Sequence, residues 1–203
     1  MARDETENYE AGFYDTKERF NSYHEQITLI HSVKAKTVLN IGCGSKFLQK
    51  YFSGSGIKVF EADIDHDLKP DILIDISKKY SPKKTYDAVT AFQILEHLPF
   101  DSLDIPLENI AALTKKYAII SVPYRAVNFS FSFDFPFFKP KFRFDFERFF
   151  ETKHSHKTHE WELGLKGTGK KIFQSKLEKF FSIKKQFVLN GNRYHYFYLL
   201  EKK

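Results

Sequence analysis

Val38-Leu39-Asn40-Ile41-Gly42-Cys43-Gly44-Ser45 is the stretch of sequence that decides the fold. The short apolar run 36–41 predicts a buried strand. The Gly-x-Gly that ends it leads into 45–54, which predicts a helix. Glycine suits such a loop because a Cβ would keep the backbone away from a ligand. In open α/β sheets the loop lies outside the carboxyl end of the strand, where ligands bind. Taken singly, the loop also fits a tight turn without a ligand.

Alternating strands and helices extend outward from this stretch. Such alternation requires crossover connections, so it predicts a mostly parallel sheet covered by helices on both faces. The further strands that we expect before residue 123 are 57–62, 71–74, 86–92 and 117–122, and the other helices are 15–33 and 102–116.

The C-terminal part of the chain changes this pattern. Thr168 is placed to cap a helix over 170–181. The pair Asn190-Gly191 then predicts an antiparallel hairpin between strands 182–189 and 193–201. A chain of 203 residues suits one domain, so we expect a single domain over 1–203 with an N-terminal helical segment, 1–35.

Composition limits the cellular setting. There is a single cysteine, Cys43, which excludes an intramolecular disulfide and favours a reducing compartment. The N-terminal residues lack the apolar run of a secretory signal, and no run of 18 apolar residues predicts a membrane span. We therefore expect a cytoplasmic protein. Residues 166–203 hold ten Lys or Arg and two acids, which fits either an acidic partner or a solvated face.

Acidic residues follow two of the predicted strands. Asp63 comes at the end of the second strand and can accept both hydrogen bonds of a ribose diol, while the apolar Ile64 beside it can cover an adenine. Asp75 and Ile76 repeat this pairing after the third strand. An acid at such a position can equally cap a turn.

After the fourth strand comes Ala91-Phe92-Gln93-Ile94-Leu95-Glu96-His97-Leu98. With this segment the order and spacing over 36–125 resemble the class I S-adenosylmethionine-dependent methyltransferases, in their small-molecule, methyltransferase type 11-like branch. The resemblance implies a Rossmann-like α/β fold with a mostly parallel seven-stranded sheet, an antiparallel last strand and helices on both faces. It also implies a transferase that uses S-adenosyl-L-methionine.

The same resemblance implies roles for individual residues. The loop would face the methionine part of the cofactor, Asp63 the ribose and Asp75 the adenine amino group, while the end of the fourth strand would border the reacting centre. The cofactor-binding residues implied are Asn40, Gly42, Cys43, Gly44, Asp63, Ile64, Asp75, Ile76, Phe92 and Gln93.

Two positions depart from the family pattern. Lys46 stands where a third glycine is common, and Asn40 where an acid is common, so both can weaken cofactor binding. A dinucleotide-binding oxidoreductase is the main alternative among proteins with this type of fold. Its fingerprint needs glycine where this chain has Phe47, so the sequence disfavours it.

Three residues are candidates for catalysis if the acceptor needs a general base. His97 follows the fourth strand, Tyr124 follows the fifth, and His159 belongs to a segment similar to one that some family members carry near the acceptor. Each also has a structural interpretation: His97 packs a helix start, Tyr124 lines a pocket wall, and the segment around His159 packs through Trp161 and Glu162.

The segment 154–164 contains three histidines and two glutamates, which are residue types that bind metals. Their spacing matches no zinc pattern, so we expect no metal.

The segment 126–164 begins with a Phe-rich stretch, with eleven phenylalanines in 126–159. Many of them alternate, which predicts extended segments with one aromatic face. The segment falls where this fold carries its substrate-determining insertion. Three interpretations stay open: a lid over an apolar acceptor, a patch over 126–150 for an oligomer or a membrane surface, or core of an enlarged domain.

The sequence therefore predicts methyl transfer to an unidentified acceptor, a small, lipid-like or glycan-like molecule. The alternatives are an RNA or protein methyltransferase, and a non-catalytic S-adenosylmethionine-binding protein. Phe92-Gln93-Ile94-Leu95 lacks the prolines that would suggest amide or exocyclic base nitrogens as targets, and no nucleic-acid module is appended. A homo-oligomer is also compatible with the sequence.

Overall fold

The computed structural model describes residues 16–125, 127–133, 142–148 and 157–203. Its strands are β1 (Thr37–Ile41), β2 (Lys58–Asp63), β3 (Ile72–Leu73), β4 (Tyr86–Phe92), β5 (Thr114–Pro123), β6 (Val127–Phe133), β7 (Phe142–Arg148), β8 (Phe181–Val188) and β9 (His195–Lys202). Its helices are α1 (Lys17–Ser32), α2 (Phe47–Tyr51), α3 (Asp104–Leu113) and α4 (Lys170–Leu177), with 3₁₀ turns η2 (His66–Leu68), η3 (Leu95–His97) and η4 (Phe100–Ser102).

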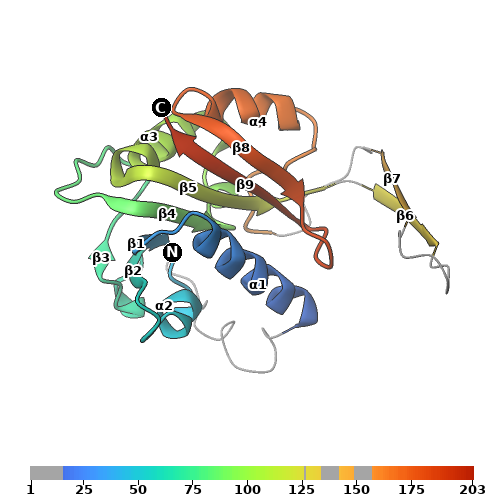
Figure 1. Cartoon of the computed structure of the whole chain (residues 1–203). Coiled ribbons are helices and arrows are strands. Elements are labelled where there is room, and N and C mark those ends of the chain that lie inside the picture. Colours follow the sequence, from blue (N-terminus) through green and yellow to red (C-terminus); the bar gives the residue numbers. More distant parts are fainter. Residues whose placement is uncertain (1–15, 126, 134–141, 149–156) are drawn as a thin grey trace.

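One sheet organises the described part of the chain, with the strand order β3-β2-β1-β4-β5-β9-β8 (Figure 1). The first five strands pair in parallel, and β9 runs antiparallel to both of its neighbours, β5 and β8. The predicted Rossmann-like methyltransferase fold with an antiparallel last strand is therefore confirmed. Because the order reverses next to β1, the loops after β1 and β4 leave the same edge of the sheet in opposite directions, where such folds bind ligands.

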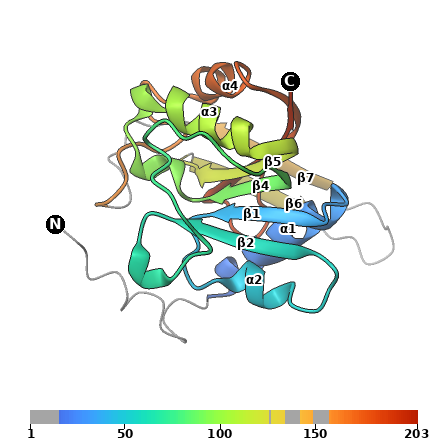
Figure 2. The same cartoon turned by 90° about the vertical axis from the view of Figure 1, so that its left-hand side faces the viewer.

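Helices cover both faces of the sheet (Figure 2). On one face α3 and α4 bury Leu107, Ile110, Phe173 and Leu177 in a core cluster with β4, β5 and β9. On the other face α1 and α2 bury a second cluster, which contains their residues Leu29, Ile30 and Leu48, and Phe52 at the end of α2. The continuous apolar character of the central strands follows from this burial on two sides.

Several element boundaries differ from the sequence expectation. The third helix covers Asp104–Leu113 rather than 102–116, because the backbone becomes extended at Thr114 and β5 begins there. The third strand shrinks to two residues, and the helix after the glycine loop to five. Thr168 does not cap α4: Gly169 is the N-cap residue, and the Thr168 hydroxyl donates to the carbonyl of Glu162 at 2.6 Å.

The N-terminal helix packs against the turn between β8 and β9. Gly191 in that turn has φ of +89°, which explains the glycine. The Asn21 amide of α1 donates to the Gly191 carbonyl at 3.1 Å, and the Ser22 hydroxyl lies 2.9 Å from His195 Nδ1. The two ends of the domain are thus joined by polar contacts as well as by apolar packing.

The hairpin of β6 and β7 forms a separate two-stranded sheet beyond the end of β5 (Figure 1). Its register sets Phe129, Phe131 and Phe133 opposite Phe146, Phe144 and Phe142, so the predicted extended segments are present. The rest of the Phe-rich stretch, at 126, 134–141 and 149–156, lies outside the described residues. Its role as lid, patch or core stays a prediction, as does the single-domain boundary.

Among the described residues, no helix is both long enough and apolar enough to cross a membrane. The predicted cytoplasmic location stays a prediction.

Candidate active site

The glycine loop after β1 has a backbone that only small residues accept easily. Gly42 has φ of +83°, and a Cβ built there would lie 2.0 Å from Cδ1 of Ile94. Gly44 also has positive φ, 45°. Gly42 is therefore required by its conformation and by the side chain that packs over it.

Lys46, where the resemblance noted in the sequence implies a third glycine, occupies a left-handed backbone conformation with φ of 57°. A side chain there costs about 1–2 kcal/mol. Its ammonium group donates to the Lys69 carbonyl at 2.5 Å. The conformation that glycine would supply is thus kept, and the long side chain is held by a carbonyl at the end of η2.

Asp63, at the end of β2, is held beside the glycine loop. The backbone N–H of Cys43 donates to Asp63 Oδ2 at 2.8 Å, and the N–H of Asp65 donates to Oδ1 at 3.0 Å. The next side chain, Ile64, is 66% exposed. A fixed carboxylate beside an exposed apolar side chain fits the ribose and adenine of a nucleoside cofactor.

Asn40 is buried and forms hydrogen bonds within the sheet. Its amide nitrogen donates to Glu61 Oε2 at 2.7 Å, and its oxygen accepts from the Thr90 hydroxyl at 2.8 Å. Burial raises the pKa of Glu61 to about 7. These contacts support a positioning role for Asn40, which ties β1 to its two neighbouring strands.

Cys43 is a buried part of the loop rather than a nucleophile. Its pKa is raised to about 12, first by burial and then by the negative charge of Asp63. The thiol therefore stays protonated near neutral pH. The backbone N–H of Cys43, rather than its thiol, is the group that donates to Asp63.

Asp75 and Ile76 lie after β3. The Asp75 carboxylate accepts from the Ser77 hydroxyl at 2.6 Å and pairs with Lys78 Nζ at 3.0 Å. These contacts hold its pKa below the usual range, with the Ser77 hydrogen bond as the largest cause. Ile76 is buried. Asp75 therefore caps a turn, as one of its two interpretations predicted. Its contact with adenine stays a prediction.

At the end of β4, Gln93 has a left-handed backbone with φ of 59°. Its N–H donates to the Ser121 carbonyl at 2.9 Å, and its amide nitrogen donates to the Ser121 hydroxyl at 3.1 Å. Non-glycine residues with positive φ are uncommon and concentrate at functional sites. The neighbouring Phe92 packs against Phe197, with ring centroids 6.0 Å apart.

The segment 158–163 lies directly against η3, although more than 60 residues separate them. The Trp161 indole N–H is shared between the carbonyls of Leu95 and Leu98, at 3.1 Å each. The N–H of Glu160 donates to the Glu96 carbonyl at 2.8 Å. Trp161 is therefore packed, as its structural interpretation predicted. This buried side chain holds the segment next to the end of β4.

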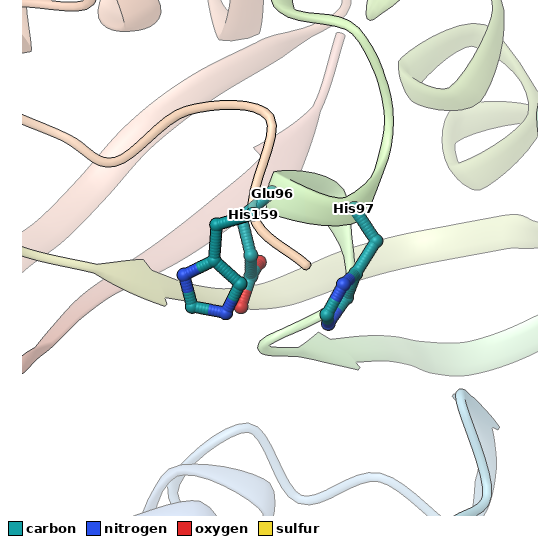
Figure 3. Close-up of side chains that lie close together, drawn as sticks. All are labelled: Glu96, His97 and His159. Atoms are coloured by element: carbon teal, nitrogen blue, oxygen red, sulfur yellow. The ribbon is translucent and has the colours of Figure 1, made fainter. Parts of the chain in front are cut away.

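This packing brings two of the three predicted catalytic residues together. The His97 and His159 rings lie 5.2 Å apart, and Figure 3 shows both beside Glu96. His97 Nδ1 is 3.2 Å from the Thr158 carbonyl, and His159 Nδ1 is 3.1 Å from Glu162 Oε1. Tyr194 joins the group, since its hydroxyl donates to Glu162 Oε1 at 3.1 Å.

Tyr124, the third candidate, contacts this group through its backbone, because its N–H donates to the Tyr194 carbonyl at 2.7 Å. It is only 3% exposed, its ring packs on Tyr196, and Lys170 Nζ lies 4.5 Å from its ring centroid. The ring is therefore packed in the core, and both the pocket-wall interpretation and a catalytic role stay predictions.

Glu96 and Tyr194 had no catalytic or binding role in the sequence expectation, whereas Glu162 was one of the two glutamates of the segment 154–164 that were considered for metal binding. Glu96 and Glu162 are fully buried carboxylates. Burial raises the pKa of Glu96 to about 8, and the charge of Glu162 adds to the effect. The sequence signal was that Glu96 precedes His97 directly and that Glu162 follows His159 by three residues, but no zinc-like spacing links the two segments. His154 and His156 lie outside the described residues.

Comparison with known proteins agrees with this geometry. A family model described as "Methyltransferase domain" matches residues 16–176. The chain therefore belongs to this family of methyltransferase domains, and the predicted enzyme class is confirmed. No curated protein sequence matches the chain.

Solved structures match over nearly the whole chain. The N-methyltransferase NodS from Bradyrhizobium japonicum WM9, in complex with S-adenosyl-L-homocysteine, has a TM-score of 0.64 at 9% identity, over 99% of this chain and 93% of that one. The magnesium protoporphyrin IX methyltransferase ChlM from Synechocystis PCC 6803, with bound S-adenosylmethionine, has 0.59 at 14%, over 96% and 86%. The glycopeptide N-methyltransferase MtfA has 0.61 at 11%, over 90% and 89%. At these identities the similarity is one of fold.

Proposed function

We propose that the chain transfers a methyl group from S-adenosylmethionine, its cofactor, to a small lipid-like or glycan-like acceptor. The observation that carries this proposal is the pair of short contacts that fix Asp63 beside the glycine loop, with Ile64 exposed next to it. Family membership supports the reaction, and the neighbours crystallised with S-adenosylmethionine or its product support the cofactor.

The cofactor residues divide between three strand ends. The loop Gly42–Gly44 faces the methionine part, Asp63 accepts from the ribose hydroxyls, and Ile64 covers the adenine. Gln93, with Phe92, borders the reacting centre. Asn40 acts indirectly, because its side chain is engaged by Glu61 and Thr90.

The methyl group of S-adenosylmethionine is electrophilic because it is bound to a sulfonium, which is a good leaving group. The protein therefore mainly orients the acceptor, an effect that can contribute about 7–11 kcal/mol. A general base contributes about 10²–10⁴-fold where the acceptor carries a proton to be lost.

His97 and His159 are the candidate bases. His97 belongs to η3, which follows Gln93 beyond the carboxyl end of β4. His159 belongs to the segment 158–163, and contacts with η3 hold that segment beside it. The buried Glu162 beside His159 orients that imidazole in the way an acid orients a catalytic histidine. The segment 126–164 then supplies the apolar surface that selects the acceptor.

The named substrates of two neighbours support a small or modified acceptor as the class to test first. They include a magnesium protoporphyrin and a glycopeptide. Those acceptors belong to the neighbours, and for this chain they suggest only the class to test first.

The experiment incubates the full chain with S-adenosylmethionine and fractionated cell extract. S-adenosylhomocysteine and methylated products are measured by mass spectrometry, with Asp63→Ala as the inactive control. Product in the small-molecule or lipid fraction supports the proposal. Product only in the RNA or protein fraction favours that alternative, and cofactor binding without product in any fraction favours a non-catalytic binding protein.

A further inference from the structure

Glu96 is a buried carboxylate whose position has no explanation in methyl transfer. Its side chain has no solvent exposure, and neither carboxylate oxygen has a hydrogen-bond partner among the described residues. Buried polar groups are almost always paired, and an unpaired buried carboxylate is costly. Such a group points to a ligand that completes it.

Two imidazoles lie beside this carboxylate, and their contacts define which nitrogen carries the proton. His97 Nδ1 faces the Thr158 carbonyl, which can only accept. His159 Nδ1 faces the Glu162 carboxylate at 3.1 Å. A proton on each Nδ1 places the lone pair of each ring on Nε2. Carbonyl and carboxylate acceptors orient metal-bound histidines in the same manner.

The three side chains converge. One donor atom from each of Glu96, His97 and His159 lies within 4.8 Å of the other two, and Figure 3 shows the side chains projecting from η3 and from the segment beside it. We propose that Glu96, His97 and His159 bind a divalent transition-metal ion. Donors around one ion at about 2.1 Å lie roughly 3–4 Å apart, so closure needs a small shift, and His97 is an exposed side chain.

The chemistry of the ligands defines the class of ion. Two imidazoles and one carboxylate suit Zn²⁺, Mn²⁺ or Co²⁺, while Mg²⁺ and Ca²⁺ prefer oxygen ligands throughout. Three protein ligands also leave positions open, as in catalytic rather than structural sites.

Charge supports a dication at this place. Glu96 and Glu162 are both fully buried. Arg125 Nε lies 4.0 Å from Glu162 Oε2 and offsets part of that charge, and Glu96 has no ion pair among the described residues. An ion bound by Glu96, with Glu162 behind His159, would compensate both carboxylates.

The test uses the full chain after removal of metals with a chelator. Binding of Co²⁺ is followed by visible absorption and binding of Zn²⁺ by calorimetry, both without cofactor or acceptor. We expect one equivalent to bind. Glu96→Gln, His97→Ala and His159→Ala should each weaken binding by about 10–100-fold or more, whereas His24→Ala on the exposed surface of α1 should not.

A thermal shift separates loss of the site from loss of the fold. Zn²⁺ should raise the Tm of the wild type and of His24→Ala but not of Glu96→Gln. Without metal, Glu96→Gln should melt no lower than the wild type, since it replaces a buried carboxyl group that has no hydrogen-bond partner among the described residues with a side chain of nearly the same shape. If Glu96→Gln does not fold, His97→Ala decides, because His97 is exposed. Absence of a stoichiometric site, or binding that survives all three substitutions, would overturn the proposal. An ion bound at Nε2 would occupy the lone pairs that His97 and His159 need to act as general bases, so the two roles exclude each other. The binding measurements use no cofactor or acceptor, so they test the metal site whether or not the protein transfers a methyl group.

Discussion

The backbone N–H of Cys43, two residues beyond β1, donates a 2.8 Å hydrogen bond to Oδ2 of Asp63, the last residue of β2. This contact joins the two sequence signals on which the cofactor site depends. It orients the carboxylate and leaves its remaining lone pairs to accept from a ribose. The account of the cofactor site rests on this relationship.

Replacing Asp63 with alanine should lower the affinity for S-adenosylmethionine at least tenfold. Each ribose hydrogen bond to a charged acceptor contributes about 1.5–3 kcal/mol. Asp65→Ala is the matched control, because Asp65 caps η2 through the N–H of Asp67. Calorimetry on both variants checks the result. Equal losses in the two variants would mean that Asp63 has no special role.

Gly42→Ala should destabilise the fold more than Gly54→Ala does. Both glycines have φ near +80°, but a Cβ at Gly54 meets nothing within 4 Å, while one at Gly42 meets Ile94. The difference isolates the steric contact, and overpacking of this kind costs about 1–3 kcal/mol. Urea denaturation measures both variants. If they lose the same stability, the packing of Ile94 over the loop is not tight.

Stability should fall in acid partly because of His195. Burial, aided by the charge of Arg19, lowers the pKa of this histidine to about 3 from the ordinary 6.5. Above pH 6.5 both folded and unfolded states are neutral here, so its contribution is complete. Between pH 6.5 and 3 the unfolded state binds the proton first, and stability falls by up to about 1.4 kcal/mol per pH unit.

His195→Gln should show a shallower fall than the wild type over pH 6.5–4.5 in urea denaturation. Glu61 and Glu96 have raised pKa values and act in the opposite sense, but they are common to both proteins. Parallel stability curves for the two proteins would show that His195 does not carry the effect. Because His195→Gln also removes the contact with Ser22 at 2.9 Å, this variant should be somewhat less stable than the wild type at every pH.

His159→Ala should abolish methyl transfer while leaving cofactor affinity within about twofold. The residue belongs to the acceptor side in this account, and loss of a base or of acceptor orientation costs about 10²-fold or more in rate. Initial rates and calorimetry on the same preparation check both halves, with thermal unfolding as the control. Loss of cofactor affinity in the folded variant would show that His159 lies on the cofactor side of the site rather than on the acceptor side.

The cofactor side of the site could be predicted because its signals are local. Gly42 and Asp63 each follow an apolar run, and parallel strands place their carboxyl ends at one edge. The boundaries were less accurate: nothing in Thr114 itself marks the point where α3 gives way to β5. The role of Gly169 rather than Thr168 as N-cap depends on a contact with Glu162 made only in the fold.

The acceptor side could not be predicted in the same way, because its contacts are distant in sequence. Trp161 bonds to carbonyls at Leu95 and Leu98, and this interaction gathers Glu96, His97 and His159. Spacing along the chain therefore carried no metal pattern. The burial of Glu96 likewise depends on tertiary packing. The sequence Leu-Glu-His-Leu is equally compatible with an exposed glutamate, so it did not predict this burial.

The most direct test of the central claim is calorimetry of the full chain with S-adenosylmethionine and, separately, with NAD. The account predicts saturable one-to-one binding of S-adenosylmethionine, lost in Asp63→Ala, and no binding of NAD, since Phe47 stands where a dinucleotide site needs glycine. Binding of NAD with no signal from S-adenosylmethionine would contradict it.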